Sequence, residues 1–203
     1  FMEHIEELVD NLRLDDKSED NLIIDYKKII KKLILKIINK QENKYIHELT
    51  FFGNNLSENI KNLEIAHNIR QKQMKEGIIA QTIIGNFIGW EDLNIGHFSG
   101  LDCRKLDNSI ILEIKNKYNT CNSNSQKTLL DKLADYKIKY PQTRCIWGIV
   151  NPKPNNKRLK ETIIHNNVEI EKIQGNELFK LIFTLNNIDY SDNIINYVRS
   201  ILY

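Results

Sequence analysis

The sequence predicts an α/β (α+β) fold: a central mixed β-sheet flanked by helices and preceded by an N-terminal helical region. Apolar residues recur at helical spacing up to about residue 72, and the pattern changes to period two and short apolar runs after Trp90. From there, strand-like and helical segments alternate. With 203 residues, 41% of them hydrophobic, the chain is long enough for one domain with one core.

The N-terminal region is expected to contain two or three helices. The clearest of them opens at Ser18-Glu19-Asp20, a cap with an acidic first turn, and its apolar residues continue to Ile38. A further helix is expected over residues 56–75, with Gly77 at its end. Residues 78–87 fit a helix or a strand, and periodicity does not distinguish the two.

A β-hairpin is expected after Trp90, with strands over residues 101–105 and 110–115 around a turn centred on Asp107-Asn108. A polar segment over residues 116–126 follows. Thr128-Leu129-Leu130-Asp131 resembles a capping box that opens a helix to about Tyr140, before Pro141. The remaining expected elements are a buried strand over 144–150, a loop over 151–156, a strand over 168–173, and helices over 176–183 and 192–202.

Charge, hydropathy and cysteine content exclude several classes of protein. The net charge is only +2, so overall charge does not indicate a nucleic-acid partner. The most apolar stretch, Ile29 to Ile38, is interrupted by lysines, so no membrane partner is expected. Three cysteines without a C-x-x-C pair fit a reduced cytoplasm, so cytoplasmic localisation is expected and a zinc site is not.

The predicted hairpin brings two acids together. A turn on Asp107-Asn108 pairs residues whose numbers sum to about 215, which places Asp102 opposite Glu113 on one face, with Lys115 two residues further along. Two converging carboxylates suit Mg²⁺, which prefers oxygen ligands, and the backbone carbonyl of Ile114 is an expected extra ligand. Lys115 would orient or deprotonate an attacking water, which indicates metal-assisted phosphoryl chemistry.

A simpler interpretation of the same residues is the solvated face of an amphipathic strand. In that case Glu113 and Lys115 would form the solvated face, and Arg104 would neutralise them diagonally. Three features weigh against it: Asp102 is in register, Leu112 and Ile114 form an apolar face behind the acids, and the segment that follows is unusually polar.

These residues resemble the core of the PD-(D/E)XK nucleases. Gly100-Leu101-Asp102, an eleven-residue step to Glu113-Ile114-Lys115 and then an αβ unit carry the resemblance, with Leu101 in place of the usual proline. The run Glu113 to Thr120, with Asn122-Ser123-Asn124-Ser125 and Asp131-Lys132-Leu133 after it, is similar to type II restriction endonucleases of the group that cuts GGNCC. The resemblance is strong over residues 85–154 and weak over the N-terminal helices.

The resemblance implies cleavage of double-stranded DNA that depends on Mg²⁺, with Mn²⁺ able to substitute, and that leaves 5′-phosphates. It also implies a homodimer and a methyltransferase in the same system that protects host DNA. Under it, residues 1–203 form a single nuclease domain. Residues 1–84 would dimerise or embrace DNA, 85–183 would form the catalytic core, and 184–203 would form the C-terminal helix.

Local charge points to the same partner. Six lysines and two aspartates lie between Lys115 and Lys139, and four basic residues without an intervening acid lie between Lys153 and Lys160. Lysines can contact phosphates, and Asn and Gln can pair with base edges. The candidate DNA contacts are His97, Asn116, Lys117, Asn119, Asn122, Ser123, Asn124, Ser125, Gln126, Lys127, Lys153, Lys157 and Arg158.

Related nucleases often carry an additional helix-borne acid or polar group near the metal. Glu76, Gln81 and Glu64 are the candidates here. Two alternatives to a restriction enzyme remain open: a repair or recombination nuclease with the same core, and a DNA-binding module that keeps the fold but does not cut.

Overall fold

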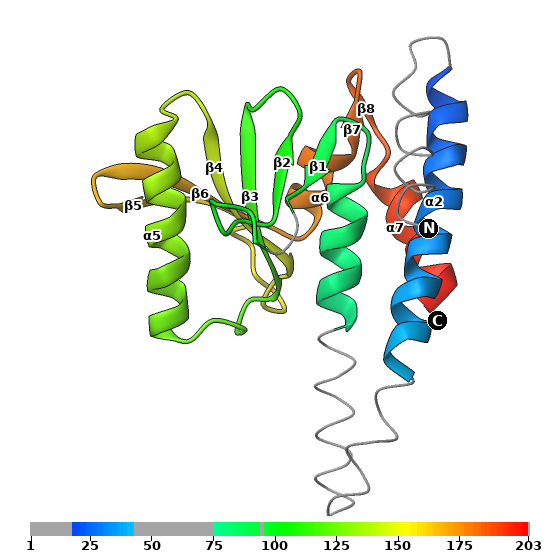
Figure 1. Ribbon diagram of the computed structural model, residues 1–203, viewed down its shortest axis with the longest axis horizontal. Helices are drawn as coiled ribbons and strands as arrows, with labels where there is room; N and C mark the ends of the chain where they lie inside the picture. The colour runs from blue at the N-terminus through cyan, green and yellow to red at the C-terminus, as the bar shows by residue number, and fades with distance from the viewer. Residues whose placement is uncertain (1–17, 43–74, 94–95, 203) are drawn as a thin grey trace, which may run out of the picture.

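A six-stranded mixed sheet forms the centre of the computed structural model, which describes residues 18–42, 75–93 and 96–202 (Figure 1). The strand order is β1-β2-β3-β4-β6-β5. β3, β4 and β6 run parallel to one another, whereas β2 pairs antiparallel with β3, β1 with β2, and β5 with β6. The strands are β1 Trp90–Asp92, β2 Cys103–Lys105, β3 Ile110–Lys117, β4 Arg144–Asn151, β5 Lys160–His165 and β6 Val168–Gln174.

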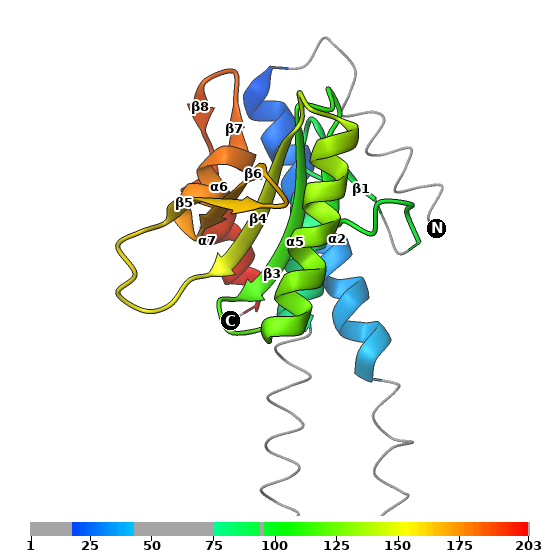
Figure 2. The ribbon, with the colours of Figure 1, turned by 90° about the vertical axis from the view of Figure 1, so that its left-hand side faces the viewer.

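Helices cover both faces of this sheet. α5 lies on one face, and α6 and a helix over residues 75–85 lie on the other, with α7 and α2 packed outside them (Figures 1 and 2). No helix in the described part of the chain is long and apolar enough to span a membrane. The remaining bounds are α2 Glu19–Glu42, α5 Ser123–Lys139, α6 Asn176–Phe183, β7 Thr184–Leu185, β8 Ile188–Asp189 and α7 Ser191–Leu202.

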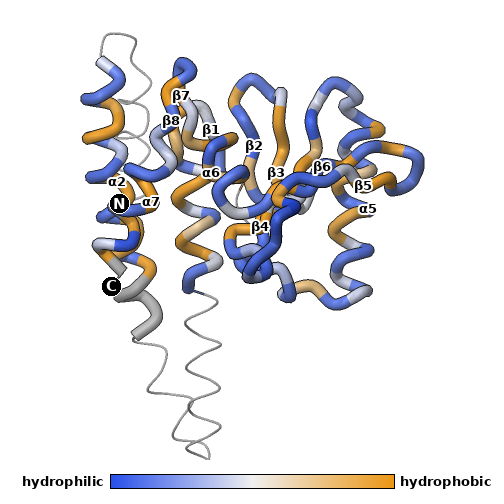
Figure 3. The backbone as a smooth tube through the Cα atoms, turned by 180° about the vertical axis from the view of Figure 1, so that it is seen from behind, coloured by the Kyte–Doolittle hydropathy of each residue, from blue (hydrophilic) through white to orange (hydrophobic). Residues whose placement is uncertain are grey.

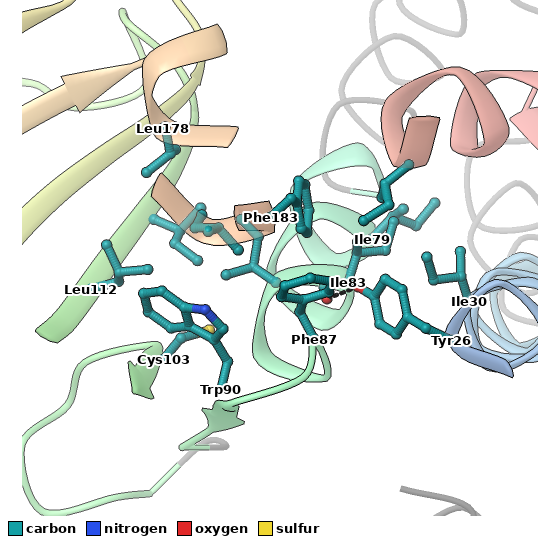
Figure 4. Close-up of a cluster of buried hydrophobic side chains, with 14 of the residues drawn as sticks. Tyr26, Ile30, Ile79, Ile83, Phe87, Trp90, Cys103, Leu112, Leu178 and Phe183 are labelled. Carbon is teal, nitrogen blue, oxygen red and sulfur yellow. Dashed lines mark hydrogen bonds between the residues drawn. The ribbon is translucent and has the colours of Figure 1, made fainter. Parts of the chain in front are cut away.

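The larger core joins the N-terminal helices to the sheet (Figure 4). Phe87 packs edge-on against the rings of Tyr26 and Phe183, with ring centroids 5.0 Å apart in both pairs. The buried Tyr26 hydroxyl donates to the Ile83 carbonyl, which ties α2 to the 75–85 helix. Because a buried hydroxyl must be hydrogen-bonded, this contact fixes how the two helices lie against each other.

A second core lies under α5. Its buried residues Leu129, Leu133 and Ala134 face Ile111 of β3 and Trp147 of β4. The exposed side of the helix is polar, and hydrophobic and hydrophilic residues recur along α2, α5 and α7 in Figure 3. This amphipathic spacing is what the helical period of the sequence predicts.

The predicted mixed sheet and most of its elements are confirmed. α6 begins and ends at the predicted residues, and α7, β4 and β6 differ by about one. The expectation that a helix ends at Gly77 is wrong, because the helix over residues 75–85 passes through it. The expected start of α5 at Thr128 is also wrong. Asn122 caps the helix, and its side chain and that of Ser125 bond each other's backbone N–H groups. β1, β5 and the β7–β8 hairpin were not predicted.

Candidate active site

The hairpin of β2 and β3 has the predicted register. Cys103 pairs with Leu112 and Arg104 with Ile111, so paired numbers sum to 215. The turn places Asn108 at φ 59°, a left-handed conformation that Asn tolerates, and the Asp107 carboxylate accepts the Ser109 N–H at 2.8 Å. The hairpin therefore brings Asp102 beside Glu113, as its sequence predicts.

Asp102 lies where β2 leaves the ladder. Its N–H donates to the Leu112 carbonyl at 3.0 Å, and its carboxylate accepts the Ile114 N–H at 2.7 Å. The Asp102 side chain thus takes the place of a strand partner for Ile114. Because the N–H and C=O of one strand residue point to the same edge, the Ile114 carbonyl points toward Asp102 as well.

The chain just before Asp102 turns sharply. Gly100 has φ +61°, and a Cβ there would lie 3.1 Å from the Nζ atom of Lys132. The Lys132 ammonium donates to the Gly100 carbonyl at 3.1 Å, which fastens this turn to α5. The ladder between β2 and β3 does not reach Gly100, since the pairing described for β2 stops at Cys103.

Glu113 is buried, with 6% of its surface exposed, and lies on the face that α5 covers. Lys115 donates to its Oε1 atom at 2.6 Å. The Oε2 atom is buried and has no hydrogen-bond partner among the residues that the structure describes. The solvated-face interpretation is therefore wrong for Glu113. Arg104 does not neutralise it, because Arg104 pairs with Glu91 at 2.7 Å.

The pKa values of Asp102 and Lys115 are both raised, for different reasons. Burial, followed by the charge of Glu113, raises the pKa of Asp102 from 3.8 to about 6, although the Ile114 hydrogen bond opposes this. Burial alone would lower the pKa of the Lys115 ammonium. The charge of Glu113 and its hydrogen bond outweigh that effect, so the pKa of Lys115 lies above its ordinary value. At neutral pH Lys115 is therefore a cation.

This donor set fits a hard divalent cation. No group of three or more His, Cys, Asp or Glu side chains able to hold a metal occurs in the ranges 18–42, 75–93 and 96–202. The predicted set, however, contains two carboxylates and one backbone carbonyl, and Mg²⁺ usually takes few protein ligands and keeps several waters. A buried carboxylate oxygen without a partner is costly, and a cation at Glu113 would satisfy it.

The candidate upstream groups that the structure describes, Glu76 and Gln81, bond Asn116 and Cys103. The Glu76 carboxylate accepts a hydrogen bond from the Asn116 amide at 3.5 Å. Gln81 contributes its backbone carbonyl to the thiol of Cys103 at 3.7 Å. Glu64 lies outside the described residues. A different acid, Asp92 of β1, was missed by the sequence analysis, and its charge contributes to the raised pKa of Asp102.

The candidate DNA contacts between Asn116 and Lys127 divide into three groups. Asn116 is buried, at 9% exposure, and bonds within the protein. Asn122 and Ser125 form the cap of α5, which orders the start of that helix. The third group lies around the carboxyl end of β3 and the start of α5. Lys117 is half-buried, and the other members are exposed: Asn119, Ser123, Asn124, Gln126 and Lys127.

A basic loop joins β4 to β5 and carries the exposed residues Lys153, Lys157 and Arg158. Figure 2 shows this loop, the carboxyl ends of β3 and β4, and the beginning of α5 at one edge of the sheet. His97 lies in the turn before Asp102, where its Nδ1 atom is 2.8 Å from the Ser99 hydroxyl. The lysines of three separate segments are thus gathered near the end of β3 that carries Lys115.

Trp147 was expected to be a core residue, and the structure confirms this at 4% exposure. It pairs with Glu113 across β3 and β4, and its indole Nε1 is buried without a hydrogen-bond partner among the described residues. Lys172 lies over its ring, 4.8 Å from the centroid. An unpaired indole N–H beside the acidic pair could not be foreseen from sequence spacing.

The mixed sheet and the acidic hairpin with its adjacent lysine define a restriction-endonuclease-like protein. Residues 2–188 match the model of the Eco47II restriction endonuclease family, and the chain belongs to this family. The match confirms the resemblance to restriction endonucleases.

One curated relative is the type II restriction enzyme Sau96I of Staphylococcus aureus, which is 33% identical over 81 residues. The matched region covers 39% of this chain and 30% of that relative. No solved structure matches this chain.

Proposed function

We propose that this protein is a type II restriction endonuclease that hydrolyses double-stranded DNA at a short specific site, with GGNCC as the candidate sequence, and leaves 5′-phosphates. The observation that carries the proposal is the buried Glu113 carboxylate beside Asp102. One of its oxygens bonds Lys115, and the other has no partner in the described part of the chain. Such a pair is expensive to bury, and a cation-dependent reaction explains why it is there.

In this proposal Asp102, Glu113 and the Ile114 carbonyl hold Mg²⁺, and Mn²⁺ can substitute. Bound there, the cation supplies Lewis-acid stabilisation of the charge that develops on the phosphate during in-line displacement. Lys115 carries its proton at neutral pH, because its pKa is raised. It can therefore orient the attacking water and offer positive charge to the phosphate, and a cation bound at Glu113 would oppose the effect that raises its pKa.

The edge of the sheet formed by the carboxyl ends of β3 and β4 is proposed to face DNA. Exposed Lys127 and the basic loop offer charges for phosphates, while Asn119, Asn124 and Gln126 offer amides for base edges. His97 precedes Asp102 and is a further candidate phosphate contact. A palindromic or interrupted palindromic target requires two copies of the site, so the active form is proposed to be a homodimer. A methyltransferase of the same system would protect host DNA.

The test is incubation of methylation-free phage DNA with the protein and Mg²⁺, followed by sequencing of the fragment ends. Discrete fragments with 5′-phosphates at one sequence are expected. Random nicking would instead indicate a repair nuclease, and no cleavage with binding retained would indicate a module that does not cut.

Lys115→Ala is the matching variant. It removes the ammonium beside Glu113, so we expect cleavage to fall by at least about a hundredfold while DNA binding in Ca²⁺ is largely retained. Lys105→Ala is the control, since Lys105 pairs with Asp107 at the opposite end of the hairpin. Equal cleavage by both variants would refute the assignment of Lys115.

A further inference from the structure

A buried amide lies behind the candidate active site. Asn116 directly follows Lys115 in β3, and alternation along the strand turns its side chain to the face opposite Glu113 and Lys115. That face is covered by the helix over residues 75–85: a Cβ placed on Gly77 would lie 3.6 Å from the Asn116 Cβ, which is van der Waals contact. The helix and the strand are thus in direct contact at this point.

Both ends of the Asn116 amide are engaged. Its Oδ1 atom accepts the side-chain amide of Asn151 at 2.8 Å, and its Nδ2 atom donates to the Glu76 carboxylate at 3.5 Å. Asn151 is the last residue of β4, pairs with Lys117 in the ladder, and accepts the Tyr118 N–H at 3.2 Å. The end of β3 is therefore held by Asn151 of the neighbouring strand β4 and by Glu76 of the helix over residues 75–85.

This arrangement determines where Lys115 sits. Asn116 is buried, whereas Glu76 is half-buried and Asn151 is exposed, so breaking a bond at the Asn116 amide would leave a desolvated polar atom and is costly. Lys115 is only half-buried, and its own contact with Glu113 is a single hydrogen bond. The backbone that carries it therefore needs support from its neighbours.

We propose that Glu76 and Asn116 are positioning residues for Lys115, and that Glu76 is not a ligand of the cation. The proposal deepens the proposed nuclease function and rests on it. Glu76 approaches β3 from the face opposite the acidic pair, and its carboxylate is directed to an amide, so its contribution passes through Asn116 to the strand.

Charge substitution provides the test. Asn116→Asp replaces the amide donor with a second carboxylate about 3.5 Å from Glu76, so the two repel each other. At saturating DNA and Mg²⁺ and pH 8, we expect kcat to fall about tenfold, with KM changed less than about twofold. Adding Glu76→Gln supplies an amide that can donate to the new carboxylate, and we expect kcat to recover to within about threefold of wild type.

Two further measurements separate positioning from other roles. Glu76→Gln alone should leave the Mg²⁺ concentration for half-maximal cleavage unchanged, whereas loss of a cation ligand would raise it at least about tenfold. The melting temperature, measured without metal or DNA, should fall in Asn116→Asp and recover in the double variant. Asn187→Asp adds the same charge in the exposed β7–β8 turn and should gain nothing from Glu76→Gln.

The proposal is overturned if the double variant cleaves no better than Asn116→Asp, or if Glu76→Gln raises the Mg²⁺ requirement. These outcomes differ from a failure of the proposed function, in which the wild-type protein cleaves no DNA with any divalent cation. In that case the recovery of the melting temperature still decides whether Glu76 and Asn116 are coupled.

Discussion

Neutralising Asp102 should stabilise the protein while abolishing its activity. The pKa of Asp102 is raised from 3.8 to about 6, chiefly by burial and then by Glu113, so its charged form is disfavoured in the folded state. One pKa unit corresponds to roughly 1.4 kcal/mol, so the cost of keeping Asp102 ionised in the folded protein is at most about 3 kcal/mol. The amide in Asp102→Asn has the shape of the protonated carboxyl and avoids that cost.

The sign of the pH dependence follows from proton binding. Between about pH 4 and 6 the folded state holds a proton that the unfolded chain has released, so wild-type stability falls as the pH rises through this window. Asp102→Asn should therefore match wild type near pH 4 and exceed it above about pH 7. We expect a gain of about 1 to 3 kcal/mol, or about 3 to 10 °C in melting temperature for a chain of this size.

The assay is thermal unfolding in EDTA across pH 4 to 8, because a bound cation would stabilise only the wild type. Asp135→Asn, at an exposed position of α5, is the control and should show no pH-dependent gain. If Asp102→Asn is less stable than wild type at pH 8, or if its gain does not vary with pH, then the Asp102 carboxylate is not held at a cost and the reasoning fails.

Two other predictions concern the surface proposed to meet DNA. Asn122→Ala removes the side-chain cap of α5 and should lower the free energy of unfolding by about 1 kcal/mol in urea denaturation, whereas a pure DNA contact would leave it unchanged. In the basic loop, Lys153, Lys157 and Arg158 can be replaced together by Gln. We expect this to weaken binding in Ca²⁺ similarly for specific and random DNA, and to reduce the slope of log K against log salt by about 2 to 3. An unchanged slope would exclude phosphate contacts by these three residues.

The hairpin that carries Asp102 and Glu113 could be predicted from the sequence because its information is local. A short turn with Asn at a left-handed position fixes the register, and the register alone places Asp102 beside Glu113. The start of α5 was misjudged for an equally local reason. Thr128 to Asp131 and Asn122 to Ser125 both resemble capping motifs, and the polar first turn hides the earlier one.

Other features depend on contacts that no spacing reveals. Glu76 and Asn116 are 40 residues apart, and only packing of the 75–85 helix on β3 brings them together. β1 has only three residues and pairs with β2, which is too short a stretch for the alternation of apolar and polar residues to reveal a strand. The burial of Glu113 is likewise tertiary, because alternation predicts only which face it occupies, and α5 determines that this face is covered.

Several groups in the site lower the stability of the folded protein, and they lie close together. Asp102, whose pKa is raised, lies beside Glu113, and Glu113 pairs with Trp147 across β3 and β4. Among the residues that the structure describes, the Oε2 atom of Glu113 and the indole N–H of Trp147 have no hydrogen-bond partner. A fold selected for stability alone would replace these groups with apolar residues, since a buried charge that is only partly paired lowers stability. Their joint presence is expected where a cation and a phosphodiester complete the site, which is why the Asp102→Asn gain should appear only without metal.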